Sequence, residues 1–376
     1  MTLRVLSILG TRPEAVKMAP VIQQLAKTPG IESLVCVTAQ HREMLDQVLD
    51  LFDIEPDYDL NLMKPNQSLA QITAAIFTEL DPILVDLEPH WILAQGDTTT
   101  VMATALLAYY RRIKFGHVEA GLRTGDKFQP FPEEINRRVA SVTADLHFAP
   151  TETSKQNLLR ENIPADQIIV TGNPVIDALK QVSQDQTPKE IRQLLDSLGI
   201  NDVVKSRLLV VTAHRRENFG QPLKNICLAL KVLAETYDDL EIVYPVHLNP
   251  NVQNTIYPIL DQIPNITLLP PLDYLPMVHL TKHATLVLTD SGGLQEEAPS
   301  LGVPVLVLRE VTERPEGVAA GTVRLVGTNT AKIIAETKRL LDSPSERLKM
   351  AQAVNPYGDG HAAERIVAAI LNNQQV

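Results

Sequence analysis

The chain has 376 residues, of which 44% are apolar and 21% carry a charge, and its formal net charge at pH 7 is −11. This length predicts two domains, and the acidic balance argues against a nucleic-acid-binding surface without excluding a local cluster of cations around a small anionic ligand. No apolar run approaches the roughly 20 residues of a membrane span, and the first residues lack a signal-peptide cleavage site, so we expect a cytoplasmic protein with no membrane insertion.

Strand-like apolar runs alternate with amphipathic helical patterns from one end of the chain to the other. In the first half, the expected strands are Leu3–Leu9, Ser33–Thr38, Trp91–Gln95, Phe115–Val118, Leu146–Ala149 and Ile168–Val170, with helices over Ser68–Leu87 and Thr98–Arg112. In the second half, the expected strands are Leu208–Thr212, Glu241–Val246, Ile266–Leu269, Thr285–Thr289, Val303–Leu308 and Val323–Val326, with helices over Pro222–Thr236 and Thr330–Leu341. This alternation is typical of parallel sheets covered by helices on both faces. The predicted fold class is therefore α/β, with two doubly wound, Rossmann-like domains of six strands each.

A stretch of turn residues around Gly172 marks the expected hinge between the two domains. We expect an N-terminal domain over residues 1–171 and a C-terminal domain over residues 172–358. The last segment, 359–376, contains a helical pattern that we expect to cross back and pack on the first domain.

The two cysteines, Cys36 and Cys227, each lie inside an apolar run. This placement predicts buried thiols in a reducing compartment. No cluster of cysteine and histidine has zinc-ligand spacing, so we expect no metal site.

Unusual polar residues follow the expected strands in both halves. They are Gly10–Glu14, Gly96–Thr98, Glu119–Arg123, Ala213–Glu217 and the turn at Ser291. In open α/β sheets, ligands bind beyond the carboxyl ends of the strands. We therefore expect these loops to form one cleft between the domains.

The stretch TDSGGLQEEAPSLG places two glycines at the start of a helix, with Ser291 as the expected N-cap. Bare N–H groups at a helix N-terminus favour anions, and Gly292 and Gly293 would let a phosphate come close. The alternative is a turn that needs glycine for a positive φ. Glu297 would accept hydrogen bonds from vicinal hydroxyls, or would only favour the helix dipole. The candidate charge partners of the phosphates are Arg12, Lys17, His214 and Arg314.

Four ionisable residues are candidates for proton transfer, namely Asp97, Glu119, Glu133 and His214. Asp97 is alternatively a helix N-cap, and Glu133, the first of two adjacent glutamates, is alternatively a first-turn acid. Glu119 lies at the end of an apolar strand, where partial burial would raise its pKa. Two arginines follow His214 and would hold its imidazole neutral or place it against a phosphate; a plain loop histidine is the alternative.

Eight motifs that contain these residues match one family. They are GTRPEAVKMAP, GDTTT, HVEAGLRTGD, PFPEEINRR, TGNPVIDAL, TAHRREN, TDSGGLQEEAPSLG and TERPE, in this order along nearly the whole chain. The chain thereby resembles the non-hydrolysing bacterial UDP-N-acetylglucosamine 2-epimerases. The resemblance implies the two-domain GT-B-like fold that one large class of glycosyltransferases shares. It also implies interconversion of UDP-N-acetylglucosamine (UDP-GlcNAc) and UDP-N-acetylmannosamine (UDP-ManNAc), and a homodimer. We expect no cofactor and a role in polysaccharide biosynthesis.

The resemblance assigns roles to individual residues. The positions that match the family's catalytic ones are Asp97, Glu119, Glu133 and His214. The positions that match its nucleotide-binding ones are Arg12, Lys17, Ser291, Gly292, Gly293, Glu297 and Arg314. Leu272 and Met277 stand where a close relative has Gln and Phe beside the uracil, so contacts to the base there would fall to backbone atoms.

Several bacterial relatives are activated by a second UDP-GlcNAc molecule beside the active-site nucleotide. By resemblance, Gln40, Arg215 and His247 match positions in that second, allosteric site. Glu43 and Asn66, however, stand where such relatives carry Gln and Arg. A carboxylate in place of an amide and the loss of a cation both oppose a second diphosphate, so we expect only weak activation.

Carbon 2 of the sugar has no adjacent carbonyl, so its hydrogen is too weakly acidic for simple removal and return. An enzyme must oxidise the sugar transiently with a nicotinamide, or eliminate the nucleotide and add it back. Neither G-x-G-x-x-G nor G-x-x-x-x-G-K-[ST] occurs in the chain, which disfavours the first route. We therefore expect elimination of UDP to a glycal and readdition. The alternatives are a hydrolysing epimerase that releases ManNAc, a glycosyltransferase of the same fold, and a non-catalytic nucleotide-sugar sensor.

Overall fold

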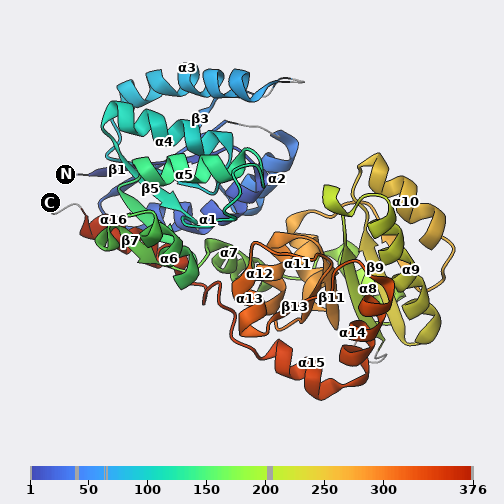
Figure 1. Cartoon of the computed structure of the whole chain (residues 1–376). Helices are drawn as coiled ribbons and strands as arrows, with labels where there is room; N and C mark the ends of the chain where they lie inside the picture. Colours follow the sequence, from blue (N-terminus) through green and yellow to red (C-terminus); the bar gives the residue numbers. More distant parts are fainter. Residues whose placement is uncertain (1, 39–41, 63, 65–66, 201–205, 374–376) are drawn as a thin grey trace. The chain divides into compact units, whose positions relative to one another are not determined.

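The computed structural model describes residues 2–38, 42–62, 64, 67–200 and 206–373, with the backbone alone at 42–44. The chain forms two compact units (Figure 1). Unit 1 comprises Met1–Lys180 and Tyr357–Val376, and unit 2 comprises Gln181–Pro356. None of the described helices is long and apolar enough to cross a membrane.

Unit 1 is built on a parallel sheet of seven strands in the order β3-β2-β1-β4-β5-β6-β7. The strands are β1 (Leu3–Leu9), β2 (Ile31–Val37), β3 (Tyr58–Asp59), β4 (Trp91–Gln95), β5 (Lys114–Val118), β6 (Leu146–Ala149) and β7 (Ile168–Val170). The helices are α1 (Arg12–Lys27), α2 (Arg42–Leu51), α3 (Leu69–Leu87), α4 (Thr99–Arg111), α5 (Glu133–Thr143), α6 (Glu152–Arg160), the 3₁₀ turn η1 (Ala165–Gln167), α7 (Pro174–Ser183) and α16 (Ala362–Asn372). The expectation of six strands was wrong for this unit, because the two-residue β3 is too short to stand out in the sequence pattern.

Unit 2 is built on a parallel sheet of six strands in the order β10-β9-β8-β11-β12-β13. The strands are β8 (Arg207–Thr212), β9 (Leu240–Pro245), β10 (Ile266–Leu269), β11 (Leu286–Thr289), β12 (Val305–Val307) and β13 (Val323–Leu325). The helices are α8 (Lys189–Ser197), η2 (Arg216–Asn218), α9 (Gln221–Thr236), α10 (Pro250–Leu260), α11 (Tyr274–Lys282), α12 (Gly292–Ser300), α13 (Pro315–Ala320), α14 (Thr330–Asp342) and α15 (Pro344–Ala351). The predicted α/β class with two doubly wound sheets is confirmed.

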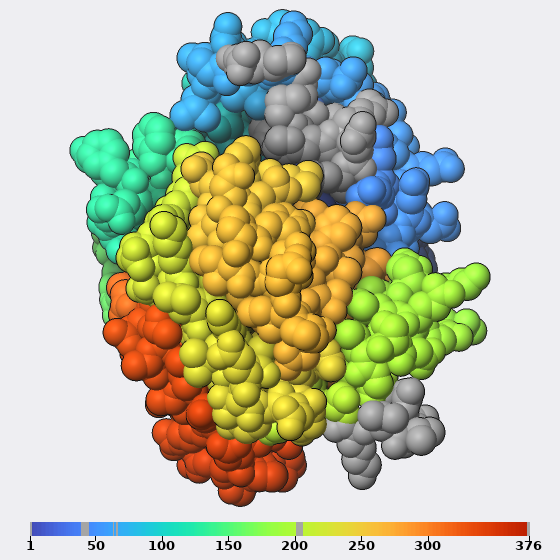
Figure 2. Space-filling view, turned by 90° about the vertical axis from the view of Figure 1, so that its right-hand side faces the viewer, coloured from blue at the N-terminus to red at the C-terminus, as the bar shows by residue number. Residues whose placement is uncertain are grey.

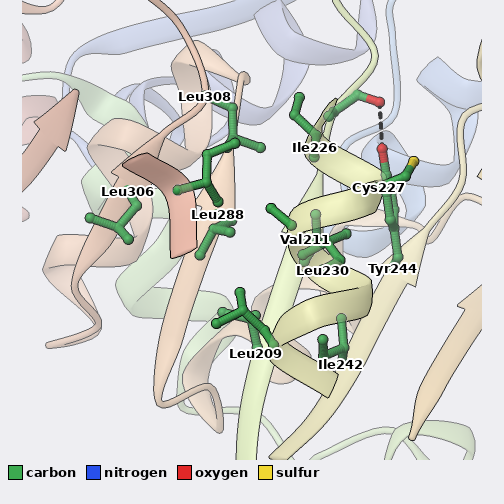
Figure 3. Packing of buried hydrophobic residues seen from close by; sticks show 14 of the residues in the cluster. Leu209, Val211, Ile226, Cys227, Leu230, Ile242, Tyr244, Leu288, Leu306 and Leu308 are labelled. Carbon is green, nitrogen blue, oxygen red and sulfur yellow. Dashed lines mark hydrogen bonds between the residues drawn. The ribbon is translucent and has the colours of Figure 1, made fainter. Parts of the chain in front are cut away.

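The sheet of unit 2 is buried on both faces, as its unbroken apolar strands predict. On β8, Leu209 and Val211 pack into one cluster with α9, while Leu208 and Val210 point into a second cluster with α8 and α11. Figure 3 shows the first cluster, in which Ile226 and Leu230 of α9 face the strands. Helices α9 and α10 cover this side, and their segment forms the yellow part of the surface in Figure 2.

The chain passes from unit 1 to unit 2 within α7 rather than at the expected boundary of 171/172. Hydrogen bonds explain the difference, because they tie the start of α7 to unit 1. The N–H of Asn173 donates to the carbonyl of Tyr357 at 2.7 Å, and Asp177 accepts the N–H groups of Ala362 and Ala363 at the start of α16. Gly172, the expected hinge, therefore lies inside unit 1.

Both cysteines are buried free thiols, as predicted. Burial raises the pKa of Cys36 and of Cys227 to about 12. Neither sulfur is therefore available as a thiolate nucleophile at neutral pH.

Candidate active site

Glu119 is a buried carboxylate just beyond the carboxyl end of β5, with 6% of its surface exposed. Lys17 Nζ, from α1, lies 2.7 Å from one of its oxygens and 2.8 Å from the other. Asn173 Nδ2 donates to Oε1 at 2.8 Å, and Gln95 Nε2 donates to Oε2. Donors on both oxygens stabilise the ionised form, so Glu119 is held as a carboxylate that accepts hydrogen bonds.

The backbone around Glu119 turns sharply. Glu119 has a φ of +63°, a left-handed conformation that is uncommon for a residue other than glycine. Gly121 follows at φ +93°, where a Cβ would lie 2.3 Å from the carbonyl oxygen of Ser154. The turn also brings Glu119 Oε2 to 3.8 Å from the position of a Cβ on Gly96. Glu119 therefore lies beside the loop that carries the next predicted carboxylate.

That carboxylate, Asp97, is held by Arg137 of α5. Arg137 Nε and Nη2 lie 2.9 Å and 2.6 Å from the same oxygen, Oδ2, and Asn136 Nδ2 donates to the Asp97 carbonyl at 2.9 Å. The N-cap of α4 is Thr98, whose side chain accepts from the N–H of Val101. Asp97 is therefore not a capping residue, and this alternative is wrong.

The adjacent glutamates at the start of α5 have different surroundings. Glu134 is fully buried, forms ion pairs with Arg137 and Arg138, and accepts the N–H groups of Thr124 and Gly125. Glu133 forms none of these contacts, and its buried Oε2 has no hydrogen-bond partner among the described residues. Glu134 thus fixes the loop, whereas Glu133 takes no part in these ion pairs.

Glu14 is a further buried carboxyl, which the sequence analysis did not single out. It lies in the first turn of α1 and accepts the N–H groups of Gly10 and Thr11, which fixes the loop before Arg12. Burial raises its pKa to about 7, although hydrogen bonds from Thr98 and from the two backbone groups lower it, and the charge of Asp97 adds to the rise. Arg12 itself is partly buried at the first position of α1.

His214, the predicted catalytic residue of unit 2, follows β8 and lies against a buried aspartate. Asp290 is fully buried, and its Oδ2 accepts the N–H groups of His214 and Arg215, each at 2.8 Å. Asp290 Oδ1 lies 3.6 Å from His214 Nδ1. Below the loop, the Tyr244 hydroxyl donates to the Ala213 carbonyl at 2.8 Å, the bond drawn in Figure 3. These contacts fix the backbone on which the imidazole is carried.

The His214 ring stacks on the ring of His247, with 5.2 Å between centroids and 13° between planes. Burial lowers the pKa of His214; the charge of Asp290 raises it, and His247 and Arg215 lower it. Arg215 is paired with Glu313 at 3.4 Å. Two residues of the predicted allosteric set, Arg215 and His247, therefore adjoin His214. The third, Gln40, lies outside the described residues, as do Asn66 and the side chain of Glu43.

The turn before α12 explains the paired glycines. Neither Gly292 nor Gly293 has a positive φ, so the conformational alternative is wrong. A Cβ on Gly292 would instead lie 2.8 Å from the Arg314 guanidinium, and a Cβ on Gly293 would lie 3.0 Å from Glu297 Oε1. The glycines therefore leave room for the close approach of these two side chains. Ser291 occupies the N-cap position, but its side chain forms no capping hydrogen bond.

Arg314 is oriented by Glu296, which is buried and forms an ion pair with the guanidinium. The backbone N–H of Arg314 donates to the Thr312 hydroxyl at 3.1 Å. A cation is thus placed at the N-terminus of α12, where the helix dipole adds to its attraction for an anion.

Leu272 and Met277 pack against the apolar cluster that α8 and α11 share with the sheet of unit 2. Their side chains are engaged in this packing. Contacts of these two residues to a base therefore remain a prediction about their backbone atoms.

The comparisons with known proteins agree with the motifs. The family model for UDP-N-acetylglucosamine 2-epimerase matches residues 23–371. The chain is 55% identical over 373 residues to the UDP-N-acetylglucosamine 2-epimerase of Salmonella typhimurium, covering 98% of each protein. The chain belongs to the UDP-N-acetylglucosamine 2-epimerase family.

Two solved epimerase structures extend the match to the fold. A crystal structure of UDP-GlcNAc 2-epimerase from Neisseria meningitidis bound to UDP-GlcNAc is 52% identical, with a TM-score of 0.91 over 99% of this chain and 100% of that one. A structure described as a putative UDP-N-acetylglucosamine 2-epimerase from Listeria monocytogenes is 48% identical, with a TM-score of 0.92 over 100% and 97% of the two chains. These matches support the GT-B-like assignment of the fold.

Within this epimerase-family chain, several site residues were missed by sequence reasoning. They are Gln95, Asn173, Arg137, Asp290, Glu296 and Glu14. Each lies inside or next to a motif quoted above, but its role depends on which partner it meets. Local patterns do not provide that information, because the partners are distant in sequence, 76 positions apart in the pair of His214 with Asp290.

Proposed function

We propose that the protein interconverts UDP-GlcNAc and UDP-ManNAc by eliminating UDP and adding it back to a glycal, as a non-hydrolysing epimerase. The observation that carries the proposal is the set of carboxylates in unit 1. Lys17 pairs with Glu119, Arg137 pairs with Asp97, and Glu133 keeps a buried oxygen without a partner among the described residues. Carboxyl groups that can take and return a proton are what proton transfer at a carbon centre requires.

The proposed reaction begins with a proton transfer at carbon 2 and continues with loss of UDP from carbon 1. A carboxylate removes the proton from carbon 2, and the C–H electron pair forms the double bond between carbons 1 and 2. The bond from carbon 1 to the diphosphate oxygen breaks, and UDP departs with the electron pair of this C–O bond. In the return step, UDP attacks carbon 1 and a proton is delivered to carbon 2 from the opposite face, which inverts that centre.

We assign the proton transfers to Asp97, Glu119 and Glu133. The ionised state of Glu119, with donors on both oxygens, favours a base or a stabiliser of positive charge rather than an acid. No donor among the described residues reaches Glu133 Oε2, so Glu133 is the better candidate for a group that carries a proton to the other face. Epimerisation needs both kinds of group.

We assign nucleotide binding to unit 2. Arg314 at the start of α12 would bind the diphosphate, and Glu297 would accept from the ribose hydroxyls. His214 would stabilise or protonate the departing UDP. By the resemblance given above, Arg12 and Lys17 complete the nucleotide-binding set, with Leu272 and Met277 beside the base.

We also propose that a second UDP-GlcNAc activates this enzyme only weakly. Arg215 is already paired with Glu313, and His247 is stacked on His214, so neither side chain is free of other contacts. Initial rates against UDP-GlcNAc concentration test this; a strongly sigmoidal curve that is lost in Arg215→Ala would contradict it.

A homodimer in the cytoplasm is the proposed form of the protein, and its product would supply polysaccharide biosynthesis. Tyr109 and Tyr110 on α4 and Val142 on α5 are exposed, and α4 contacts both α3 and α5. Exposed apolar groups on adjacent helices are typical of an interface. Sedimentation velocity of the wild type and of Tyr110→Glu tests the assembly; a monomeric wild type would refute it.

The hydrolysing alternative differs in the last step, because UDP is not added back to the sugar. Water captures the intermediate, and free ManNAc accumulates with an equal amount of UDP. Proton NMR of a reaction with UDP-GlcNAc resolves all three sugars. Formation of UDP-ManNAc supports the proposal, and release of free ManNAc would favour the hydrolysing class.

A further inference from the structure

We propose that Asp290 is a positioning residue for His214, which holds the imidazole in one tautomer and stabilises its cation as UDP departs. The proposal rests on the proposed function, in which His214 acts on the leaving diphosphate. In this role Asp290 orients the His214 side chain, in addition to anchoring the backbone of the loop.

The two oxygens of Asp290 have different surroundings. Oδ2 accepts three hydrogen bonds, from the N–H groups of His214 and Arg215 and from Asn218 Nδ2, at 2.8, 2.8 and 2.9 Å. These three hydrogen bonds to Oδ2 are enough to anchor the loop. Oδ1 is buried, has no hydrogen-bond partner among the described residues, and lies 3.6 Å from His214 Nδ1.

A buried carboxylate oxygen without a donor is costly, and a modest rotation of the imidazole would bring Nδ1–H within hydrogen-bond reach. Catalytic hydrogen bonds are often long in the free enzyme and shorten when the ligand binds. With Nδ1–H directed at Oδ1, the other ring nitrogen, Nε2, is left to face the diphosphate. A carboxylate that orients a histidine in this way also stabilises the imidazolium.

The groups around His214 act in opposite directions. Asp290 favours the imidazolium, whereas the stacked His247 ring, the Arg215 charge and burial all disfavour it. Without Asp290, every remaining contact would keep the ring neutral. Among these described neighbours, Asp290 is therefore the one that makes a protonated His214 attainable during the reaction.

The test compares three variants with the wild-type enzyme. Asp290→Asn keeps one oxygen for the loop N–H groups but turns an NH₂ toward Nδ1. Asn218→Ala removes one bond to Oδ2 and leaves the imidazole pair intact, so it is the control for loop anchoring. His247→Phe keeps an aromatic ring in the stack but removes the ring nitrogens that can bind a proton. Folding of each variant is checked by thermal unfolding and by UDP binding.

In Asp290→Asn, kcat should fall at least about tenfold with little change in KM, because the lost interaction stabilises the His214 imidazolium only while UDP departs. The limb of the kcat–pH profile that His214 controls should move to lower pH in Asp290→Asn and to higher pH in His247→Phe. Asn218→Ala should leave that limb in place. An equal shift in Asn218→Ala and Asp290→Asn would overturn the proposal, because anchoring alone would then explain it.

The tautomer supplies a readout that does not depend on turnover and that is made on the wild-type protein. Nitrogen NMR of histidine-labelled wild-type protein, with the His214 signals identified from their loss in His214→Gln, should show neutral His214 protonated at Nδ1. A neutral ring protonated at Nε2 would refute the role of Asp290. If wild-type enzyme fails to convert UDP-GlcNAc while His214 shows the Nδ1–H form, the proposed function fails and the assigned pair stands.

Discussion

Replacing Lys17 by Met tests how strongly the buried ion pair holds Glu119. The Lys17 ammonium and the Glu119 carboxylate are 15% and 4% exposed, and Nζ is 2.7 Å and 2.8 Å from the two oxygens. Loss of one partner from a buried pair costs roughly 3–5 kcal/mol, because the other charge remains uncompensated. Gln95 and Asn173 still donate to Glu119, so we expect a value near the lower limit, about 3 kcal/mol.

The assay uses the single tryptophan of the chain. Trp91 is buried in β4 of unit 1, so its fluorescence follows the unfolding of the unit that holds the pair. Denaturant curves are measured for Lys17→Met, Glu119→Gln and the double variant. The double variant should be more stable than the sum of the single effects predicts, by about 2 kcal/mol, because it contains no isolated buried charge.

Arg4→Met is the matched control in the same unit. Arg4 pairs with Glu32 at 2.9 Å, but both side chains are nearly half exposed, so its loss should cost at most about 1 kcal/mol. Turnover in Lys17→Met should fall at least about a hundredfold, since Glu119 loses the cation that holds it in place. A coupling energy below about 0.5 kcal/mol between Lys17 and Glu119 would refute the reasoning.

Three further predictions follow from other contacts. The folded-state pKa of Glu14 is about 7, above its ordinary value of 4.5, so stability that is present below pH 4.5 is lost as the pH rises through 7, by up to about 3 kcal/mol. Glu14→Gln should therefore flatten the pH dependence of unfolding, followed by Trp91 fluorescence between pH 5 and 8. An unchanged slope would contradict this. Arg314→Ala should weaken UDP binding in calorimetry by at least about tenfold, the value of one charge-assisted hydrogen bond. Asp97→Asn should change UDP affinity less but lower turnover at least about a hundredfold. A larger loss of affinity in Asp97→Asn than in Arg314→Ala would exchange the assigned roles. Gly292→Ala places a Cβ 2.8 Å from the Arg314 guanidinium, which Glu296 holds, so it should also weaken UDP binding, and wild-type affinity would show that Arg314 moves freely.

The main strands and the two-sheet plan were predictable because buried parallel strands are short, apolar and bounded by turn residues. Trp91–Gln95 and Leu146–Ala149 have the predicted bounds, and both are fully buried. β3 was missed, because two residues carry no periodicity. The boundary after residue 171 was misplaced, because the contacts of Asn173 and Asp177 with the distant C-terminal segment decide it.

The site was predictable in its residue types and less so in its partners. The paired glycines suggested an anion site at a helix start, and the structure shows that they make room for Arg314 and Glu297. Burial of Glu119 was expected to raise its pKa, but the sequence did not reveal that Lys17, more than a hundred positions away, would stabilise the carboxylate. Ion pairs between distant segments depend on the tertiary fold, which local patterns do not encode.

Proton NMR of UDP-GlcNAc with the enzyme in deuterated water tests the elimination mechanism most directly. The account predicts that UDP-ManNAc forms without any added cofactor and that deuterium from the solvent appears at carbon 2 of both sugars. Product that retains its original hydrogen at carbon 2 would contradict elimination with proton transfers by different groups on the two faces of the sugar.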